Sequence, residues 1–281
     1  MCVSAPLRGA LCLRRTYDPG HFAFLLLGVY SGMGVKIIEG FTFDDVLIRP
    51  SASAMEPSEA QLKTHIAGLD LALPFLSAAM DKVTEARMAI ALGRLGGLGV
   101  IHRNCSVEEQ VKMVKEVKSA GVKVAAACGP FHAERAKALD EAGCDAIVID
   151  CAHGHNLNVI ASAKKIKSGL KHAKMIYGNI ATGEAAKAAC TFADAVKVGV
   201  GPGSICTTRL ISGVGVPQLS AVIEVAEVAS KKKIPVIADG GIRNSGDIAK
   251  ALAAGASAVM CGNLFAGTDE TPGKTVMKNG R

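Results

Sequence analysis

The residues best suited to chemistry lie in one glycine-rich segment, residues 199–209, which directly follows an apolar run. Glycines allow several backbone N–H groups to surround an anion, and Ser204 adds a hydroxyl donor. Cys206 lies in the same segment, close in sequence to Arg209, and cationic and N–H surroundings favour the thiolate form that acts as a nucleophile. On spacing alone, the plainer interpretation of Cys206 as a partly buried structural cysteine is favoured.

Glycines also follow two later apolar runs, at positions 240–241 and 262. Glycine-rich backbone at the ends of three consecutive runs predicts a phosphate-binding site, whereas tight turns are the alternative interpretation. Carboxylates end two of the runs, Asp150 and Asp239. Each can accept hydrogen bonds from ribose hydroxyls, or can cap a helix.

Two further polar segments end apolar runs: SAAMD at residues 77–81 and DCAHGH at residues 150–155. The cysteine and histidines of the second segment are residue types that bind zinc. No fourth ligand follows at a suitable spacing, so we expect this segment to line a cofactor cleft rather than to hold a metal.

The elements that must position these residues alternate along the chain from about residue 70. Continuous apolar runs predict buried parallel strands, and the stretches between them have helical periodicity. The expected strands are 71–79, 98–102, 122–128, 146–150, 174–178, 195–200, 234–239 and 256–261. The expected helices include 84–95, 107–120, 132–142, 183–191, 218–230 and 245–254, and several are followed by glycine, the usual helix stop.

Eight such strands in a chain of 281 residues predict an α/β protein with the (β/α)8 fold, the TIM barrel. Only seven helices separate the strands, so we expect the final helix to be missing. The alternative, a doubly wound sheet, lacks its dinucleotide fingerprint, because G-x-G-x-x-G does not follow the first strand. Barrel active sites lie at the carboxyl ends of the strands, where all the candidate residues above fall.

Composition narrows the class of protein. Hydrophobic residues make up 49% of the chain, which excludes a disordered protein, and the longest apolar run, near residues 21–30, is too short to span a bilayer. A net charge of +7 with 4% aromatic residues favours a small anionic ligand over nucleic acid. Nine cysteines without a CxxC pair favour reduced thiols and a cytoplasmic protein. Residues 1–33 loosely imitate a signal peptide, but we expect a disordered extension.

Five motifs together resemble the IMP dehydrogenase/GMP reductase family: FTFDDVL (41–47), SAAMD (77–81), GPGSICTTR (201–209), GVGVPQ (213–218) and ADGGI (238–242). The resemblance extends over residues 34–273, and IHRN (101–104) and DCAHGH are closer to the dehydrogenases. It implies NAD-dependent oxidation of IMP to XMP, a step of guanine nucleotide biosynthesis, through a covalent thioimidate on Cys206. The alternatives are GMP reductase, which converts GMP to IMP with NADPH, and a non-catalytic nucleotide-binding remnant.

The resemblance also implies a role for each candidate residue. It places the IMP substrate against Ser77, Met80, Asn179, Ser204, Asp239, Gly241, Gly262 and Asn263. It assigns Thr208 to the hydrolytic step beside Cys206, and it places NAD near Asp150, Cys151 and Ala152. It implies a potassium ion on the backbone carbonyls of Gly201, Gly203 and Cys206, and a homotetramer.

The chain departs from the family's pattern in three respects. The regulatory CBS modules that usually follow the second strand are missing, because residues 105–119 lead directly to the third strand. Asn263 stands where many dehydrogenases have serine. The barrel, residues 34–281, ends before the family's mobile flap and last helix. We therefore expect the covalent intermediate to form more readily than it is hydrolysed, and the last strand to expose apolar surface.

Overall fold

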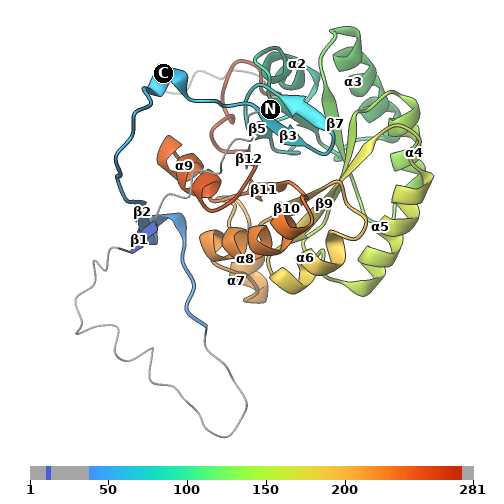
Figure 1. Ribbon diagram of the computed structural model, residues 1–281. Helices are drawn as coiled ribbons and strands as arrows, with labels where there is room; N and C mark the ends of the chain where they lie inside the picture. The colour runs from blue at the N-terminus through green and yellow to red at the C-terminus, as the bar shows by residue number, and fades with distance from the viewer. Residues whose placement is uncertain (1–10, 14–37, 274–281) are drawn as a thin grey trace, which may run out of the picture.

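Eight parallel strands form a closed barrel in a computed structural model that describes residues 11–13 and 38–273 (Figure 1). Each strand pairs with the next one in the sequence, and Cys261 of the last strand pairs with Ser77 of the first. The strands are β5 (Phe75–Ser77), β6 (Leu98–Ile101), β7 (Val124–Cys128), β8 (Ala146–Asp150), β9 (Lys174–Ile180), β10 (Ala195–Val198), β11 (Val236–Asp239) and β12 (Ala258–Cys261). The predicted (β/α)8 barrel is confirmed.

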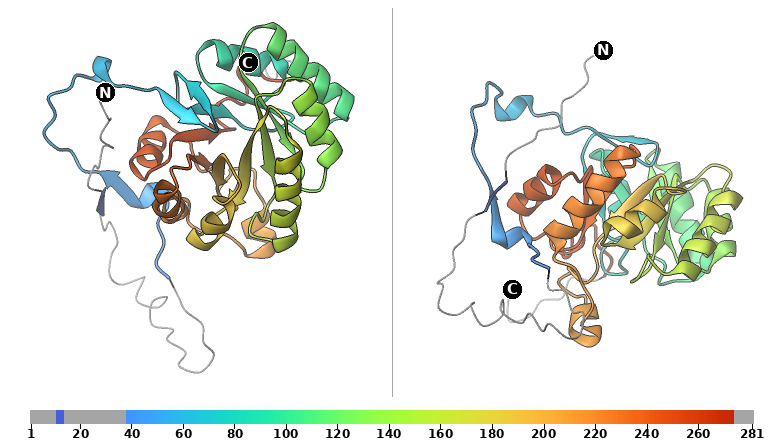
Figure 2. Two further views of the ribbon diagram at one scale, coloured as in Figure 1. Left: turned by 45° about the vertical axis from the view of Figure 1, so that its right-hand side comes forward. Right: turned by 60° about the horizontal axis from the view of Figure 1, so that its bottom comes forward.

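Helices cover the outside of the barrel, each in the connection between two successive strands (Figure 2). They are α2 (Ala86–Arg94), α3 (Val107–Ser119), α4 (Ala133–Glu141), α5 (Leu157–Gly169), α6 (Gly183–Ala189), α8 (Gln218–Lys231) and α9 (Ser245–Ala253). A short helix, α7 (Thr208–Ser212), lies in the long loop between β10 and α8. Gly121 and Gly143 follow α3 and α4 with φ angles of 74° and 86°, the left-handed conformation that ends a helix. In the described residues up to Gly273, no helix follows β12.

A hairpin closes the amino-terminal end of the barrel. It consists of β3 (Thr64–Ile66) and β4 (Leu69–Leu71), and Ile66 packs into the apolar cluster inside the barrel. The Thr64 hydroxyl donates to the carbonyl of Ser257, just before β12, at 2.7 Å. Because this end is filled, ligands reach the barrel interior from the carboxyl end of the strands.

The expected first strand, residues 71–79, is divided in two. Leu71 belongs to β4, where it pairs with Thr64, and only Phe75–Ser77 joins the barrel as β5. Pro74, which has no N–H group to donate, stands between them and accepts a hydrogen bond from Val259 through its carbonyl.

Two apolar layers follow from the alternation of side chains along each strand. In β8, Ile147 and Ile149 face outward into the main core between the strands and the helices. Ala146 and Val148 face inward and form part of the cluster inside the barrel. The same alternation directs Lys197 of β10 into the barrel, because its neighbours Val196 and Val198 belong to the outer core.

The expectation that the last strand exposes apolar surface is wrong. All four residues of β12 are at most 2% exposed. Val259 and Cys261 belong to the main core, and Phe265, from the segment after β12, packs against it. Arg87 of α2 donates to the carbonyl of Asp269 in this segment, so the residues after β12 also contact the neighbouring helix.

Only three residues of the predicted amino-terminal extension are described: Leu11–Leu13 form β1, which pairs antiparallel with β2 (Val46–Ile48). The rest of residues 1–33, for which we expected disorder, lies outside the described residues. No helix in the described part of the chain is long and apolar enough to cross a membrane.

One buried carboxylate connects α4 to the start of β9. Asp140, which is 3% exposed, accepts the backbone N–H groups of Lys171, His172 and Ala173 at 2.7, 3.1 and 2.6 Å. Burial alone would raise the pKa of Asp140, but the three hydrogen bonds outweigh it and lower the pKa below its usual value.

We predict that Asp140→Ala destabilises the fold by about 2–4 kcal/mol, because three buried N–H groups lose their acceptor. A folded-state pKa below the unfolded value means that Asp140 stabilises fully above about pH 4, and that this contribution is lost as the pH falls through the lowered pKa. Urea unfolding of the variant at pH 7 and pH 3 measures both effects. Glu141→Ala, at an exposed neighbouring position, is the control; an equal loss there would contradict the prediction.

Candidate active site

A cavity of about 320 Å³ opens at the carboxyl ends of the strands. Residues that follow β5, β10, β11 and β12 line it, together with Thr42, Phe43 and Asp44 of the segment before β2. The predicted site residues on its wall are Met80, Ser204, Asp239, Gly241, Gly262 and Asn263. The structure therefore brings together the glycine segments that the sequence analysis assigned to phosphate binding.

Backbone forms much of this wall. Gly240 and Gly241 have φ angles of 92° and 78°, which disfavour residues with a side chain. A Cβ atom on Gly240 would lie 2.8 Å from Cγ of Pro202, and one on Gly262 would lie 3.0 Å from the Met80 sulfur. Close backbone of this kind is suited to an anion such as a phosphate.

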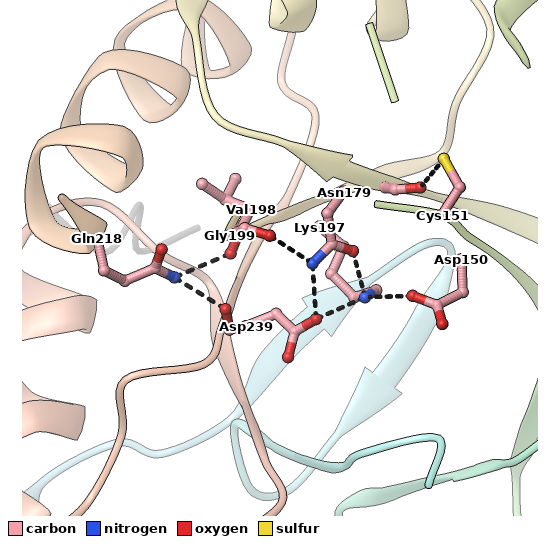
Figure 3. A network of polar contacts seen from close by, with 9 residues as sticks. Asp150, Cys151, Asn179, Lys197, Val198, Gly199, Gln218 and Asp239 are labelled. Carbon is pink, nitrogen blue, oxygen red and sulfur yellow. Dashed lines mark hydrogen bonds and ion pairs between the residues drawn. The ribbon is translucent and has the colours of Figure 1, made fainter. Parts of the chain in front are cut away.

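Beside the cavity, Lys197 connects three strands (Figure 3). Its side chain is 3% exposed, and its ammonium group donates to Asp150 at 2.9 Å and to Asp239 at 2.5 Å. It also donates to the side-chain carbonyl of Asn179. Sequence reasoning missed Lys197. The signal that could have found it is a lysine at an inward-facing position of a strand that is otherwise apolar.

The cluster fixes the protonation states of its members. Burial by itself would lower the pKa of Lys197, but the negative charges of Asp150 and Asp239 outweigh it and raise that pKa. The Lys197 charge in turn lowers the pKa of Asp150 below its usual range. At neutral pH the cluster therefore contains an ammonium ion and an ionised Asp150.

Asn179 and Lys197 both donate to the same oxygen of Asp239, Oδ2. The Asn179 amide nitrogen lies 3.0 Å from this oxygen and 2.7 Å from the carbonyl oxygen of Gly199. Within the described residues, Oδ1 of Asp239 accepts no hydrogen bond, and Asp239 lines the cavity. This oxygen is free to accept hydroxyl groups of a ligand.

Cys206 and Thr208 lie together next to the cavity rather than on its wall. The Cys206 thiol is 3.2 Å from the Thr208 hydroxyl, and the Cys206 N–H donates to the Gly203 carbonyl at 3.0 Å. The preceding residues Gly203, Ser204 and Ile205 do line the cavity. The half-buried thiol therefore lies within a few residues of the backbone that would hold an anion.

Arg209, which is close in sequence to Cys206, does not hydrogen-bond to its thiol. The Arg209 guanidinium donates instead to the carbonyls of Val200 and Val216, at 3.4 and 2.6 Å. Within the described residues, the only hydrogen bond made by the thiol is to Thr208.

The remaining predicted residues lie away from the cavity wall. Ser77 is fully buried at the end of β5, and its hydroxyl has no partner among the described residues. The Cys151 thiol donates to the Gly178 carbonyl at 3.3 Å, and burial raises its pKa, while Ala152 next to it is exposed. Cys151 and Ala152 follow Asp150 at the end of β8, which lies across the barrel from the glycine wall. The described residues contain no group of three or more His, Cys, Asp or Glu side chains that could hold a metal.

Comparison with known proteins decides the family. The family model described as the IMP dehydrogenase / GMP reductase domain matches residues 40–281. The chain belongs to this family. The match includes the glycine wall, the Lys197 cluster and the Cys206 loop described above.

Curated relatives from distant organisms are named inosine-5'-monophosphate dehydrogenase. The chain is 41% identical to inosine-5'-monophosphate dehydrogenase of Methanocaldococcus jannaschii, over 88% of this chain and 76% of that protein. It is 44% identical to the enzyme of Cryptosporidium parvum, over 86% of this chain and 72% of that protein. The first alignment spans 377 positions, more than the length of this chain, so it contains residues without a counterpart here. In the structure β6 leads directly to α3, with no inserted domain between them.

We predict that Lys197→Met destabilises this family member by about 3–5 kcal/mol, because it leaves two carboxylates facing each other without a cation. The remaining pair would bind a proton more readily than the unfolded chain does. The variant should therefore lose more stability relative to the parent at pH 8 than at pH 5. Thermal unfolding at both pH values measures this difference.

Lys167→Met is the matched control, because Lys167 pairs with Asp194 in a more exposed position. Its effect should be about 1 kcal/mol or less and similar at both pH values. An equal loss in the two variants would show that the buried cluster has no special role.

Proposed function

We propose that this chain oxidises IMP to XMP with NAD as hydride acceptor, a step in guanine nucleotide synthesis. The observation that carries the proposal is the placement of Cys206 directly after three residues that line the glycine-walled cavity, with Asp239 on the same wall. An anion site, a hydroxyl acceptor and a nucleophile thus adjoin each other, as covalent catalysis on a nucleotide requires.

Each wall feature fits one part of a purine nucleotide. The backbone at Ser204, Gly241 and Gly262 would bind the phosphate, with Asn263 at the rim. The free Oδ1 of Asp239 would accept the ribose hydroxyls. Met80 supplies an apolar surface for the base, and Asn179 and Ser77 support the site from behind it.

The proposed chemistry has two stages. The Cys206 thiolate would add to C2 of IMP, and the C2 hydrogen would leave as a hydride with its electron pair; NAD, held near Asp150, Cys151 and Ala152, would supply the hydride acceptor. Water then adds to C2, the carbon–sulfur bond breaks, and XMP and the free thiol are released. The Thr208 hydroxyl, 3.2 Å from the sulfur, is placed to take part in the proton transfers of the second stage.

The residues at the opposite side of the mouth fit the NAD that would accept this hydride. Asp150 is ionised and uses only one carboxylate oxygen for Lys197, so its other oxygen can accept ribose hydroxyls. Cys151 and Ala152 follow it along the same wall, and the partly exposed surface there leaves room for a cofactor.

A potassium ion also fits the donor set of the Cys206 loop. Backbone carbonyls are hard oxygen ligands, and those of Gly201, Gly203 and Cys206 would bind it. The Gly203 carbonyl already accepts one N–H group but keeps a second lone pair.

We further propose that the protein is cytoplasmic and assembles as a homotetramer. In each subunit, residues 34–281 would form one barrel domain after an extension of residues 1–33.

The proposal predicts that 6-chloro-IMP labels Cys206 covalently and that IMP protects it. With IMP and NAD, the chain should release at least one NADH per Cys206. Cys206→Ala should abolish both results, because Cys261, the other described thiol next to lining residues, is 1% exposed and belongs to the outer core. Mass spectrometry of the labelled peptides and absorbance of NADH measure them.

Cys190→Ser, which changes a half-buried thiol at the end of α6, is the control and should be labelled at the parent rate. Labelling of a different cysteine would overturn the assignment of the nucleophile. Binding of IMP without NADH release would indicate a non-catalytic protein, and oxidation of NADPH with GMP would indicate a GMP reductase.

A further inference from the structure

The loop that carries Cys206 leaves and rejoins the barrel at one point. We use the term reactive loop for residues 199–217, between β10 and α8. Gln218, the first residue of α8, points back into the barrel and is 2% exposed. Its amide nitrogen donates to the carbonyls of Val198 at 2.9 Å and Asp239 at 3.0 Å (Figure 3). One side chain thus joins the residues on either side of the reactive loop.

Gln218 makes these two bonds at a cost. Both amide hydrogens are used on carbonyls, which fixes the orientation of the amide, and its oxygen Oε1 is buried without a partner among the described residues. Such a group normally destabilises a fold, so its presence calls for a role. The strand ends are also unusually close here: a Cβ atom on Gly199 would lie 2.0 Å from the Asp239 carbonyl oxygen.

Arg209 makes a second connection across the base of the reactive loop. Its guanidinium joins the carbonyls of Val200 and Val216, two residues after Val198 on one side and two before Gln218 on the other. Its aliphatic part fills the space beside Gly201 and Gly215, where a Cβ atom would lie 2.5 and 2.8 Å from Cγ of Arg209, respectively. We call these two connections, through Gln218 and Arg209, the loop neck.

We propose that the loop neck sets the position of the Cys206 thiol relative to the nucleotide, and that Gln218 is its main positioning residue. Through the Asp239 backbone, Gln218 also fixes the carboxylate that would bind the ribose. Gln218 therefore fixes the position of the Cys206 loop relative to Asp239 on the cavity wall. The inference rests on the proposed function, because it concerns alignment of the thiol with a bound nucleotide.

The chain contains a matched control for this geometry. Gln110 of α3 is fully buried, and its amide nitrogen donates to the carbonyls of Ile101 at 3.4 Å and Ala127 at 2.8 Å, near the ends of β6 and β7. The two bonds donated by the amide nitrogen follow the same pattern, and Gln110 also accepts a hydrogen bond from Arg135 through its side-chain oxygen at 2.6 Å. The segment that carries Cys206 does not lie between the two strands that Gln110 joins. Gln110→Met therefore removes two bonds like those that Gln218→Met removes and one more, the bond from Arg135, so it is a stringent control; only Gln218→Met should affect Cys206.

The test compares two reactions of Cys206 in the parent, Gln218→Met and Gln110→Met, with mass spectrometry of each cysteine peptide. In Gln218→Met, labelling by 6-chloro-IMP should slow by about 10- to 100-fold, since misplacement by roughly 1 Å costs this much. Alkylation of Cys206 by iodoacetamide, which needs no nucleotide site, should stay the same or become faster. Gln110→Met should match the parent in both reactions.

Parent-like 6-chloro-IMP labelling of Gln218→Met, or an equal slowing in Gln110→Met, would overturn the proposal. If Gln218→Met does not fold, Arg209→Met decides: slower 6-chloro-IMP labelling with retained iodoacetamide alkylation supports the loop neck, and unchanged labelling refutes it. Failure of 6-chloro-IMP to label the parent chain would count against the proposed function itself, and is thus distinguishable from failure of the loop neck.

Discussion

The arrangement of the barrel mouth depends on the buried positive charge of Lys197. Lys197 lies at an inward-facing position of β10. The hairpin of β3 and β4 fills the amino-terminal end of the barrel, so only the carboxyl end is open. Removing an ammonium ion from water costs several kcal/mol unless anions and acceptors replace the water. Here two carboxylates and one amide, from the ends of β8, β9 and β11, provide that replacement. The barrel mouth is therefore held in one arrangement by electrostatics as well as by strand pairing.

This arrangement leaves part of each carboxylate unused. Lys197 contacts one oxygen of Asp150 and one of Asp239, and the second oxygen of each carboxylate accepts no hydrogen bond within the described residues. One cation thus prepares two acceptor sites, one on the cavity wall and one on the side proposed for the cofactor. Under the proposed function, IMP and NAD would both be aligned on this one buried ammonium group.

Patterns along the chain predicted the strands and helices because each apolar run is continuous and each helix begins or ends with a clear signal. They failed where a contact depends on the closed barrel. Lys197 looks like a polar interruption of a strand until its inward direction is known. The division at Leu71 and the covering of β12 by the segment around Phe265 arise from tertiary packing. Closeness in sequence favoured an influence of Arg209 on the thiol, whereas its guanidinium bonds to the carbonyls of Val200 and Val216 at the loop neck.

The loop neck has a consequence for variation in the length of the reactive loop. Gln218 bonds directly to Val198, so the two ends of the reactive loop are held together by a contact outside the loop. The positions of these two ends therefore depend little on the number of residues between them. The entropy of closing a longer segment grows only with the logarithm of its length. A change in length between these anchors therefore costs the barrel little free energy, and its main effect falls on the position of the Cys206 thiol.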